Sequence, residues 1–560
     1  MDTSTNITRD IAKVEMMESN ETTTNTTDTK PISTNTQADG DEPKYLGKWK
    51  SRKHFLSALN SHKLTLTLQD NTIVATSTIT ISNEFHALTD IGWYGSAYRL
   101  TTCSTQFFYG KLYEQFRVKW VLVLAVAILE LGSIVFAAAP ASTAFIIGRA
   151  ISGCGASGIV TGVFIAIAHA VPLHLRPIYN STVGALECIA SIVGPVIGGA
   201  LTTCVSWRWC FWLNLPVGGF TVVVLIFFFK NSPNQKITEG SIASKLKQLN
   251  FLHLIVFSGG IVCLLLALER GGTIDSWSSG RIIALLVVSG VAFAVFVALE
   301  MLRKERAVIP RSILTNKTVG LCVLYAFCAS AAFNLTDYFL PLWFQAIKEV
   351  SAAKSGQMLL PSIVSLSFAA ISSGFILSAI GYYTPLMLLG STMMGIGFGF
   401  LTSFTTNTGS SAWIGWQVMY GIGMGLAIPQ PWSAIQTALA VEDIPAGMTA
   451  IAFAISTGAA IFISISQNIF INLLRQGLSK IPDLDVDRIV KQGATNFLAT
   501  VPMSERSLVI GVYNFPVTRT FWTCVAVVCL GMIAALVMDW NSVKRPEKEV
   551  DAEKEQGEKV

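Results

Sequence analysis

The sequence predicts an all-α integral membrane protein with about fourteen transmembrane helices. Of its 560 residues, 51% are hydrophobic and only 13% are charged, and the mean hydropathy is +0.53. Soluble globular chains carry roughly 25% charged residues. Apolar stretches of about 20 residues, the length that crosses a bilayer, recur from end to end and leave no room for a large soluble domain.

Thirteen apolar segments are predicted to span the bilayer. They are 93–112, 119–139, 143–168, 182–203, 209–229, 251–269, 281–302, 320–345, 357–380, 384–404, 412–439, 447–473 and 518–538. An opening span at 54–81 contains Asn60, His62, Lys63 and Asp70, and hydropathy alone rejects it. We include it because thirteen spans would put the two similar polar tails on opposite sides. The alternative is that part of this segment is an artefact of the gene model.

The distribution of basic residues predicts the orientation of the chain. With fourteen spans and a cytosolic N-terminus, the short cytosolic loops are rich in Lys and Arg, including Lys111, Arg117 and Lys119. The short outer loops hold far fewer, such as Arg208 and Lys348. Cytosolic loops carry an excess of basic residues in membrane proteins. Both tails are therefore predicted to be cytosolic.

Several classes of function are disfavoured by what the sequence lacks. The net charge of +5 is small for this length, and no basic face suggests nucleic acid. No CxxC pair, His cluster, nucleophile elbow or Walker A sequence is present, so we expect no metal, no cofactor and no enzyme activity. Cys204 and Cys210 flank a predicted outer loop, where a disulfide is possible but two buried thiols are favoured.

A glycine-rich motif lies in the predicted fifth span. Gly194 and Gly198 are one helical turn apart, which lets a neighbouring backbone approach closely. Pro195 bends the helix, and Gly199 completes the pattern Gly-Pro-x-x-Gly-Gly. Glu187 shares the face of Gly194 and Gly198, so it is predicted to point toward protein. Ordinary packing of small residues is the simpler interpretation.

The loop before the third predicted span combines acidic and basic residues. Gly110 and Leu112 are followed by Glu114, and Arg117 and Lys119 supply positive charge. An acid and bases at helix ends can hold two helices together in one state and release them in another. A plain positive-inside loop is the alternative.

The fourth predicted span carries a deep arginine. Arg149 follows an apolar run, and a charge at mid-membrane costs about 2.5–3.5 kcal/mol on insertion scales. Further along the chain, an aromatic string contains Trp207, Arg208, Trp209, Asn214 and Pro216. Aromatic residues commonly mark the membrane interface.

Together these motifs resemble the major facilitator superfamily, and in particular the fourteen-span drug:proton antiporter family in its fungal toxin and multidrug efflux branch. Residues 194–199 resemble the antiporter motif, 110–119 the loop signature, and 149–153 the Arg-x-x-x-Gly motif implicated in proton coupling. Residues 207–216 resemble the pattern Trp-Arg-Trp-x-Phe-x-x-Asn-x-Pro, and 70–76 the first-span motif. The resemblance runs from about residue 65 to residue 540.

The resemblance implies a major facilitator fold of two six-helix bundles plus two linking helices, with the substrate cavity at the midplane between the bundles. The implied organisation is a disordered cytosolic tail at 1–53, an N-terminal bundle at 54–230, a cytosolic loop and linking helices at 231–303, a C-terminal bundle at 304–540 with an outer loop at 475–517, and a cytosolic tail at 541–560.

The resemblance also implies a function. It predicts a secondary active exporter of small lipophilic organic compounds, driven by protons, acting as a monomer in the plasma membrane. A vacuolar or vesicle membrane is the alternative location. An importer of a siderophore or polyamine on the same fold is the alternative function, which the motif at 194–199 disfavours.

Charged groups within the spans are the candidates for proton coupling. Asp70 is the first choice, because it lies in the first-span motif, and it is followed by Glu187 and Asp337. An acid that meets Arg149 in one transporter state only would bind and release a proton as the state changes. Fixed salt bridges are the alternative, and for Glu130 that structural role is favoured. Arg99 also departs from the family pattern and is expected to form such a bridge.

Overall fold

The computed structural model of this protein describes residues 77, 80–82, 84–87, 90–229, 245, 251–272, 275–302, 313, 315–481 and 506–544. These residues all belong to one compact unit, Tyr45–Val560. Most of the predicted opening span at 54–81, including Asp70, lies outside the described residues. The count of fourteen spans therefore stays a prediction, as do the predicted boundaries of the two bundles and tails.

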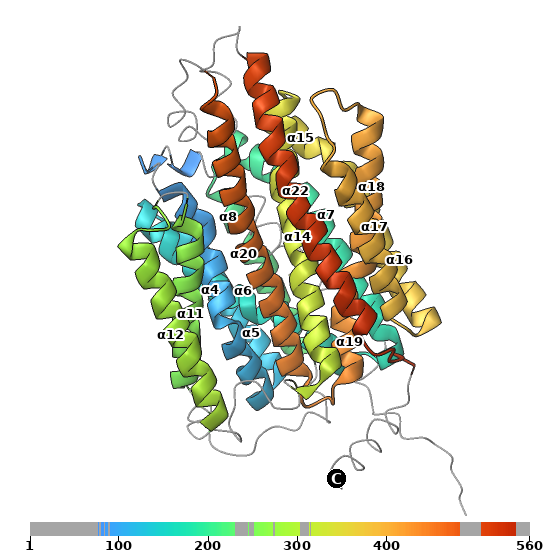
Figure 1. Cartoon of the computed structure of the whole chain (residues 1–560). Coiled ribbons are helices and arrows are strands. Elements are labelled where there is room, and N and C mark those ends of the chain that lie inside the picture. The colour runs from blue at the N-terminus through green and yellow to red at the C-terminus, as the bar shows by residue number, and fades with distance from the viewer. Residues whose placement is uncertain are drawn as a thin grey trace, which may run out of the picture. The chain divides into compact units, whose positions relative to one another are not determined.

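The described part of the chain is built from helices, and the long ones run along one common direction (Figure 1). They are α4 (Ile91–Gln115), α5 (Val118–Ala137), α6 (Ser142–Ala170), α7 (Arg176–Cys204), α8 (Trp209–Trp212), α9 (Asn214–Phe228), α11 (Phe251–Arg270), α12 (Gly280–Leu302), α14 (Lys317–Ile347), α15 (Ala352–Met358), α16 (Leu360–Ile380), α17 (Thr384–Leu401), α18 (Ser410–Ala427), α19 (Gln430–Ala438), α20 (Ile444–Leu478) and α22 (Arg506–Val537). All thirteen apolar segments predicted from the sequence fall on these helices.

Ten helices in the described part are long and apolar enough to cross a membrane. The predicted spans on α4, α7 and α18 are helical but are not among these ten. For α4 the reason is its composition, since polar residues such as Arg99, Thr101, Thr102 and Gln106 interrupt the apolar sequence. Proline lies in the first turn of α7, α16, α17, α19 and α20, where its missing N–H costs no helical hydrogen bond.

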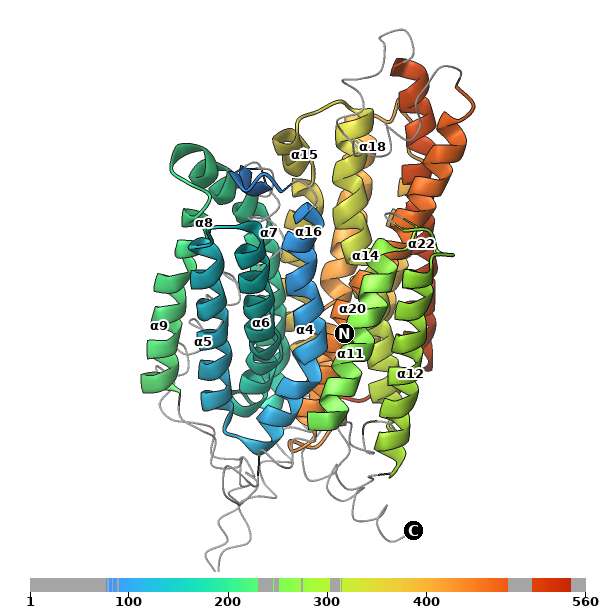
Figure 2. The same ribbon diagram turned by 90° about the vertical axis from the view of Figure 1, so that its left-hand side faces the viewer.

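Burial separates the central helices from those at the periphery. Helix α6 is buried along most of its length, and it packs against α4 and α5. Helix α12 packs chiefly on α11 at one flank (Figure 2) and leaves apolar side chains such as Val287 and Leu302 exposed, at 58% and 80%. A large apolar face exposed in this way suits contact with lipid.

Helices distant in the sequence meet along the length of the unit. Helix α7 packs along α16, and α4 packs along α20. Both pairs join the predicted N-terminal bundle to the predicted C-terminal bundle. The end at which α4, α6 and α9 finish and α7 and α11 begin is called the predicted cytosolic end below; α19 lies there, and α8 and α15 lie at the opposite end (Figure 1).

Two details of the sequence-based prediction need correction. The predicted outer loop at 475–517 is shorter, because α20 continues to Leu478 and α22 begins at Arg506. The added turns of α22 bury Val509, Tyr513 and Val517, which are spaced four residues apart and form one helix face.

The two cysteines near the predicted outer loop are both free thiols. The disulfide that the sequence allowed is therefore not formed. Cys210 is buried, as expected, but Cys204 is exposed because it is the last residue of α7.

Candidate functional site

A cavity opens between α14, α16 and α18. Its lining is mostly apolar, and it includes the acidic residue Asp337 and the aromatic residue Tyr420. The lining residues are Phe333, Thr336, Asp337, Leu359, Ser362, Ile363, Leu366, Tyr420 and Met424. Pockets that bind small organic molecules are typically apolar with a few convergent polar groups.

Asp337 lies well inside α14, and neighbouring side chains do not cover it. The next residue, Tyr338, is 48% exposed. Arg99 on α4 is also exposed, and its positive charge acts on both Asp337 and Tyr338. The same charge acts on Glu269 at the end of α11. The charge of Arg99 thus reaches the predicted site residue Asp337, and it also reaches Glu269, which the sequence gave no reason to select.

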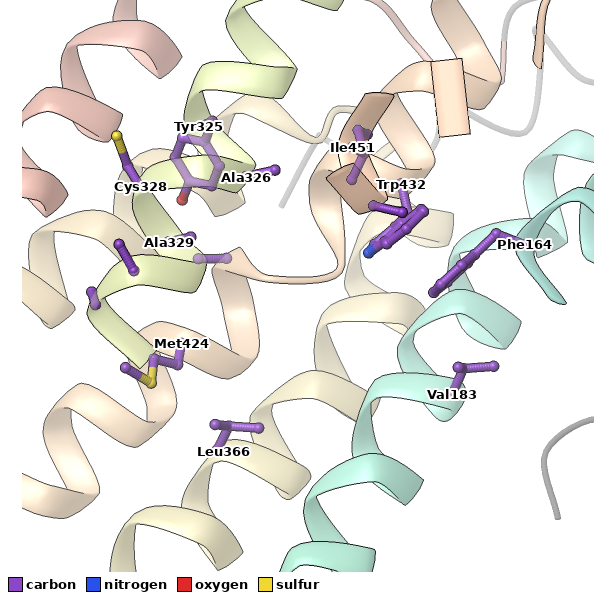
Figure 3. Packing of buried hydrophobic residues seen from close by; sticks show 14 of the residues in the cluster. Phe164, Val183, Tyr325, Ala326, Cys328, Ala329, Leu366, Met424, Trp432 and Ile451 are labelled. Carbon is purple, nitrogen blue, oxygen red and sulfur yellow. The ribbon is translucent and has the colours of Figure 1, made fainter. Parts of the chain in front are cut away.

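At the predicted cytosolic end, aromatic and polar contacts close the space between α6, α7 and α19. The rings of Phe164 and Trp432 are stacked, with centroids 3.7 Å apart and planes at 9° (Figure 3). Asn180 Nδ2 donates to Ser433 Oγ at 3.2 Å and to Gln436 Oε1 at 3.3 Å. Gln436 Nε2 donates to the Phe164 carbonyl at 3.3 Å. These five residues are called the seal below.

Close backbone approaches reinforce the seal. A Cβ atom added to Gly374 on α16 would lie 2.8 Å from Ser181 Oγ and 2.9 Å from both Ile178 Cα and the Pro177 carbonyl oxygen. A Cβ atom on Gly110 of α4 would lie 2.6 Å from Thr449 Oγ1 on α20. Glycine therefore permits two helix contacts between the predicted bundles at their cytosolic ends.

Comparison with known proteins identifies the family. The family model described as Major Facilitator Superfamily matches residues 64–463. An MFS-type efflux pump, MFS1 of Arthroderma benhamiae, is 42% identical over 477 residues, which is 85% of this chain and 89% of the relative. The efflux pump aflT of Aspergillus parasiticus is 41% identical over 85% of this chain and 93% of its own. This chain belongs to the major facilitator superfamily.

Solved structures support the fold of this transporter. The proton:xylose symporter XylE has a TM-score of 0.55 at 15% identity, over 87% of this chain and 95% of its own. The human organic anion transporter MFSD10 has a TM-score of 0.54 at 12% identity, over 84% and 99%. Because it belongs to this superfamily, the protein is a multi-pass membrane transporter and not an enzyme.

The superfamily loop motif of the transporter is mostly helical. Helix α4 continues to Gln115, and Glu114 forms a 2.7 Å salt bridge with Lys111. Lys119 Nζ donates to the Ile226 carbonyl at 2.6 Å, near the end of α9. A cation placed there is favoured by the helix dipole. The negative charge of Glu114 also lies close enough to act on Asp443, just before α20.

Neither Arg149 nor Glu130 lines the cavity. Arg149 is fully buried; its Nε donates to the Tyr94 carbonyl at 2.9 Å, and its guanidinium lies 4.5 Å from the Tyr98 ring centroid. These contacts hold α6 against α4. Glu130 lies against Gly218 on α9, and both its carboxylate oxygens are buried without a hydrogen-bond partner among the described residues. The fixed salt bridge expected for Glu130 is therefore not found there.

The antiporter motif of the transporter lies in the half of α7 away from the predicted cytosolic end. Gly194 and Gly198 are buried, and the Cys210 thiol is 3.6 Å from the Gly198 carbonyl oxygen. Glu187 is half-buried on the same helix. Pro195 and Gly199 lie on the same helix. The roles predicted for Glu187 and this motif stay predictions.

The aromatic string caps the opposite end of the transporter. Trp207 is buried, and its Nε1 donates to Glu84 at 2.6 Å. Arg208 forms a 2.7 Å salt bridge with Glu84 and stacks on Trp207 with its guanidinium 4.3 Å from the ring centroid. Trp209 is 54% exposed, as expected of an interface residue, and Asn214 is buried at the start of α9. Sequence reasoning missed Glu84, since its partners are more than a hundred residues away.

Glu84 makes the stability of the folded protein depend on pH. Partial burial opposes ionisation, but the hydrogen bonds from Trp207 and Arg208 outweigh it and lower the pKa of Glu84. A carboxylate with a lowered folded-state pKa stabilises the protein above its unfolded pKa, about 4.3, and loses that effect as the pH falls through the folded value. Glu84→Gln should therefore lower the melting temperature at pH 7 and by less at pH 4. Thermal unfolding of both proteins at the two pH values checks this, and an equal difference at both would contradict it.

Proposed function

We propose that this transporter exports small lipophilic organic compounds, such as drugs, toxins or secondary metabolites, in exchange for protons. The observation that carries the proposal is the likeness to efflux pumps at 41–42% identity over 85% of the chain. The apolar cavity at Asp337 supports it, because such a lining suits greasy substrates. An importer of a siderophore or polyamine is the competing function.

The arrangement of the helices supports alternating access. In this conformation the seal and the glycine contacts close the predicted cytosolic end. Rocking one bundle against the other would break them and expose the cavity to the cytosol. Export then requires both conformations, and closure of the cytosolic end commits substrate to release outside. The closed contacts are therefore proposed to form part of the transport cycle.

Proton coupling is proposed to use Asp337 among the described acids. It faces the cavity within a membrane-spanning helix, where a change of charge is sensitive to its surroundings. Asp70 and Glu187 remain alternatives, with Arg149 as the predicted partner of a coupling acid. We further propose that the transporter acts as a monomer in the plasma membrane.

Transport in inside-out membrane vesicles tests the proposed function. Inside-out vesicles with an acidic lumen should accumulate the neutral dye Nile red or the cationic dye rhodamine 6G in a transporter-dependent manner. Nigericin, which collapses the pH gradient, should abolish the accumulation. Gradient-driven uptake into right-side-out vesicles instead would favour the importer, and accumulation unaffected by nigericin would exclude proton exchange.

A further inference from the structure

One asparagine of α20 holds the segment between α11 and α12 with its whole side-chain amide. Asn468 Nδ2 donates to the Gly271 carbonyl at 3.1 Å and to the Ser464 carbonyl of its own helix at 2.9 Å. Its Oδ1 accepts from Trp277 Nε1 at 3.2 Å. Both the donor and the acceptor of the amide are therefore engaged, and neither an aspartate nor an apolar side chain would make the same three hydrogen bonds.

The segment that Asn468 contacts is fixed in shape. The Gly272 amide donates to the Asp275 carbonyl at 2.8 Å, and the Asp275 carboxylate forms a 3.0 Å salt bridge with Arg270. Gly272 has a φ of +73°, which favours glycine, and a Cβ atom there would collide with Asn468 Oδ1. A braced turn thus approaches α20 at a position where only glycine permits the contact.

The helices on the two sides of this contact belong to different parts of the fold. An apolar cluster joins α11 and α12 to α4, and it includes Phe107 of α4, Phe257 of α11 and Phe296 of α12. Ser258 Oγ of α11 also donates to the Ser104 carbonyl of α4 at 2.6 Å. The linking pair α11–α12 is therefore packed on the predicted N-terminal bundle, whereas α20 is part of the predicted C-terminal bundle (Figure 2).

The contact of Asn468 lies at the end opposite the seal. Helix α11 begins at the predicted cytosolic end, so Gly271 and Trp277, which follow its last residue, lie at the other end. Nearer the cytosolic end, the Phe453 ring of α20 lies 5.3 Å from Phe257 and 5.1 Å from Phe107, measured between centroids. Rocking the bundles about the midplane displaces both ends, so it alters both contacts unless the linking pair leaves α4.

We propose that the linking pair moves with the N-terminal bundle, and that Asn468 is a latch that holds it against α20 while the cytosolic end is closed. The latch consists of the Asn468 amide, the Gly271 carbonyl and the Trp277 indole, and it opens when the cytosolic end opens. Asn468 is thus a positioning residue of the transport cycle, which acts through the linking helices and not on the substrate. This inference rests on the alternating access proposed above, but not on the direction of transport or on the substrate.

The distribution of conformations without substrate tests the latch. The full-length transporter, with its native cysteines replaced, is placed in nanodiscs with spin labels at His174 and Ala379, which report the cytosolic end. In Asn468→Leu the population with the longer distance should grow about tenfold, because two hydrogen bonds of the closed conformation are lost. Asn468→Asp should act similarly, since a carboxylate donates to neither carbonyl. Asn472→Leu, at an exposed position one turn further along α20, is the matched control and should change nothing.

The partner of Asn468 gives a second test. Trp277→Phe removes the indole donor but keeps an aromatic ring, so it should shift the same distribution by a smaller factor, about threefold. Combined with Asn468→Leu it should add nothing, because the bond between the two residues is already lost. A residue that only supports folding would instead lower abundance and melting temperature and leave the distance distribution unchanged.

Cross-linking decides which bundle carries the linking pair. Ser104→Cys with Ser258→Cys allows a short, reducible bifunctional thiol reagent to join α11 to α4, and dye transport in vesicles should then continue as before the reaction. Trp277→Cys with Asn468→Cys allows the same reagent to join the linking pair to α20. This second bridge should stop transport, and cleaving it with a reducing agent should restore the level seen before the reaction.

Several outcomes would overturn the inference. Transport that survives the bridge to α20, or that is lost with the bridge to α4, would mean that the linking pair moves with the C-terminal bundle. An unchanged distance distribution in Asn468→Leu, or an equal shift in Asn472→Leu, would contradict the latch. If the wild type carries dye into right-side-out vesicles only, the proposed export function fails, while the distances and the bridges still decide on the latch.

Discussion

Gly374→Leu is expected to reduce export at least tenfold while the protein remains in the membrane. Two of the three atoms nearest an added Cβ are backbone atoms of Pro177 and Ile178, at 2.9 Å, and these cannot rotate away. Overpacking of this kind costs about 1–3 kcal/mol or more. The cost falls only on the conformation in which α7 and α16 touch, so the variant should rest with its predicted cytosolic end open.

The same substitution at another glycine distinguishes this effect from a general loss of folding or stability. A Cβ atom on Gly399 of α17 would meet nothing within 4 Å, so Gly399→Leu should export normally. The conformation is measured by the distance between spin labels at His174 and Ala379, which are exposed at the predicted cytosolic ends of the α7 and α16 pair. Gly374→Leu should lengthen this distance. Wild-type export by Gly374→Leu at normal abundance would disprove the role of this contact.

Trp432→Ala is expected to reduce export to a comparable extent, because Trp432 is one of the seal residues. Trp432 is buried against Phe164 of the other predicted bundle, and truncating a buried tryptophan costs about 3–5 kcal/mol. Because the stack joins the two bundles, part of this cost applies only to the closed conformation. Export should fall by about tenfold to a hundredfold, which corresponds to 1.4–2.7 kcal/mol of that cost.

The conservative substitution distinguishes sealing from folding. Trp432→Phe keeps a ring for Phe164 to stack on and should retain most of the export. In Trp432→Ala the spin-label distance between His174 and Ala379 should lengthen, and the substrate should still bind from the cytosolic side. An unchanged distance together with a large loss of abundance would mean that Trp432 contributes to folding alone.

The fold class of this protein was determined by its sequence alone. Apolar stretches of sufficient length must form helices in a membrane, because no water is present to satisfy exposed backbone groups. This requirement is local, so all thirteen apolar segments could be located without knowledge of their neighbours. The motifs at 194–199 and 207–216 were also local, and they were sufficient to indicate the family that the comparisons established.

Helix ends were less predictable, because contacts outside the apolar region also stabilise helical turns. The first turns of α22 are an example. Tyr513 is buried against Phe470, with ring centroids 5.3 Å apart, and Asn514 accepts a 2.7 Å hydrogen bond from Trp343 Nε1. These partners belong to α20 and α14. Hydropathy carries no information about them, so the outer loop was predicted to be too long.

Only the tertiary structure decided which charges act on one another. Arg99, Glu269 and Asp337 are separated by 170 and 68 residues in the sequence, and each lies on a different helix. Their grouping depends on how α4, α11 and α14 rotate about their axes, which packing against all their neighbours determines. The same holds for Phe164 and Trp432, and for Glu84 with Trp207. The hydropathy of a segment follows from its own residues, so the fold could be predicted from the sequence. The electrostatic and stacking partners of a side chain depend on how the helices pack together, so the site could not be predicted.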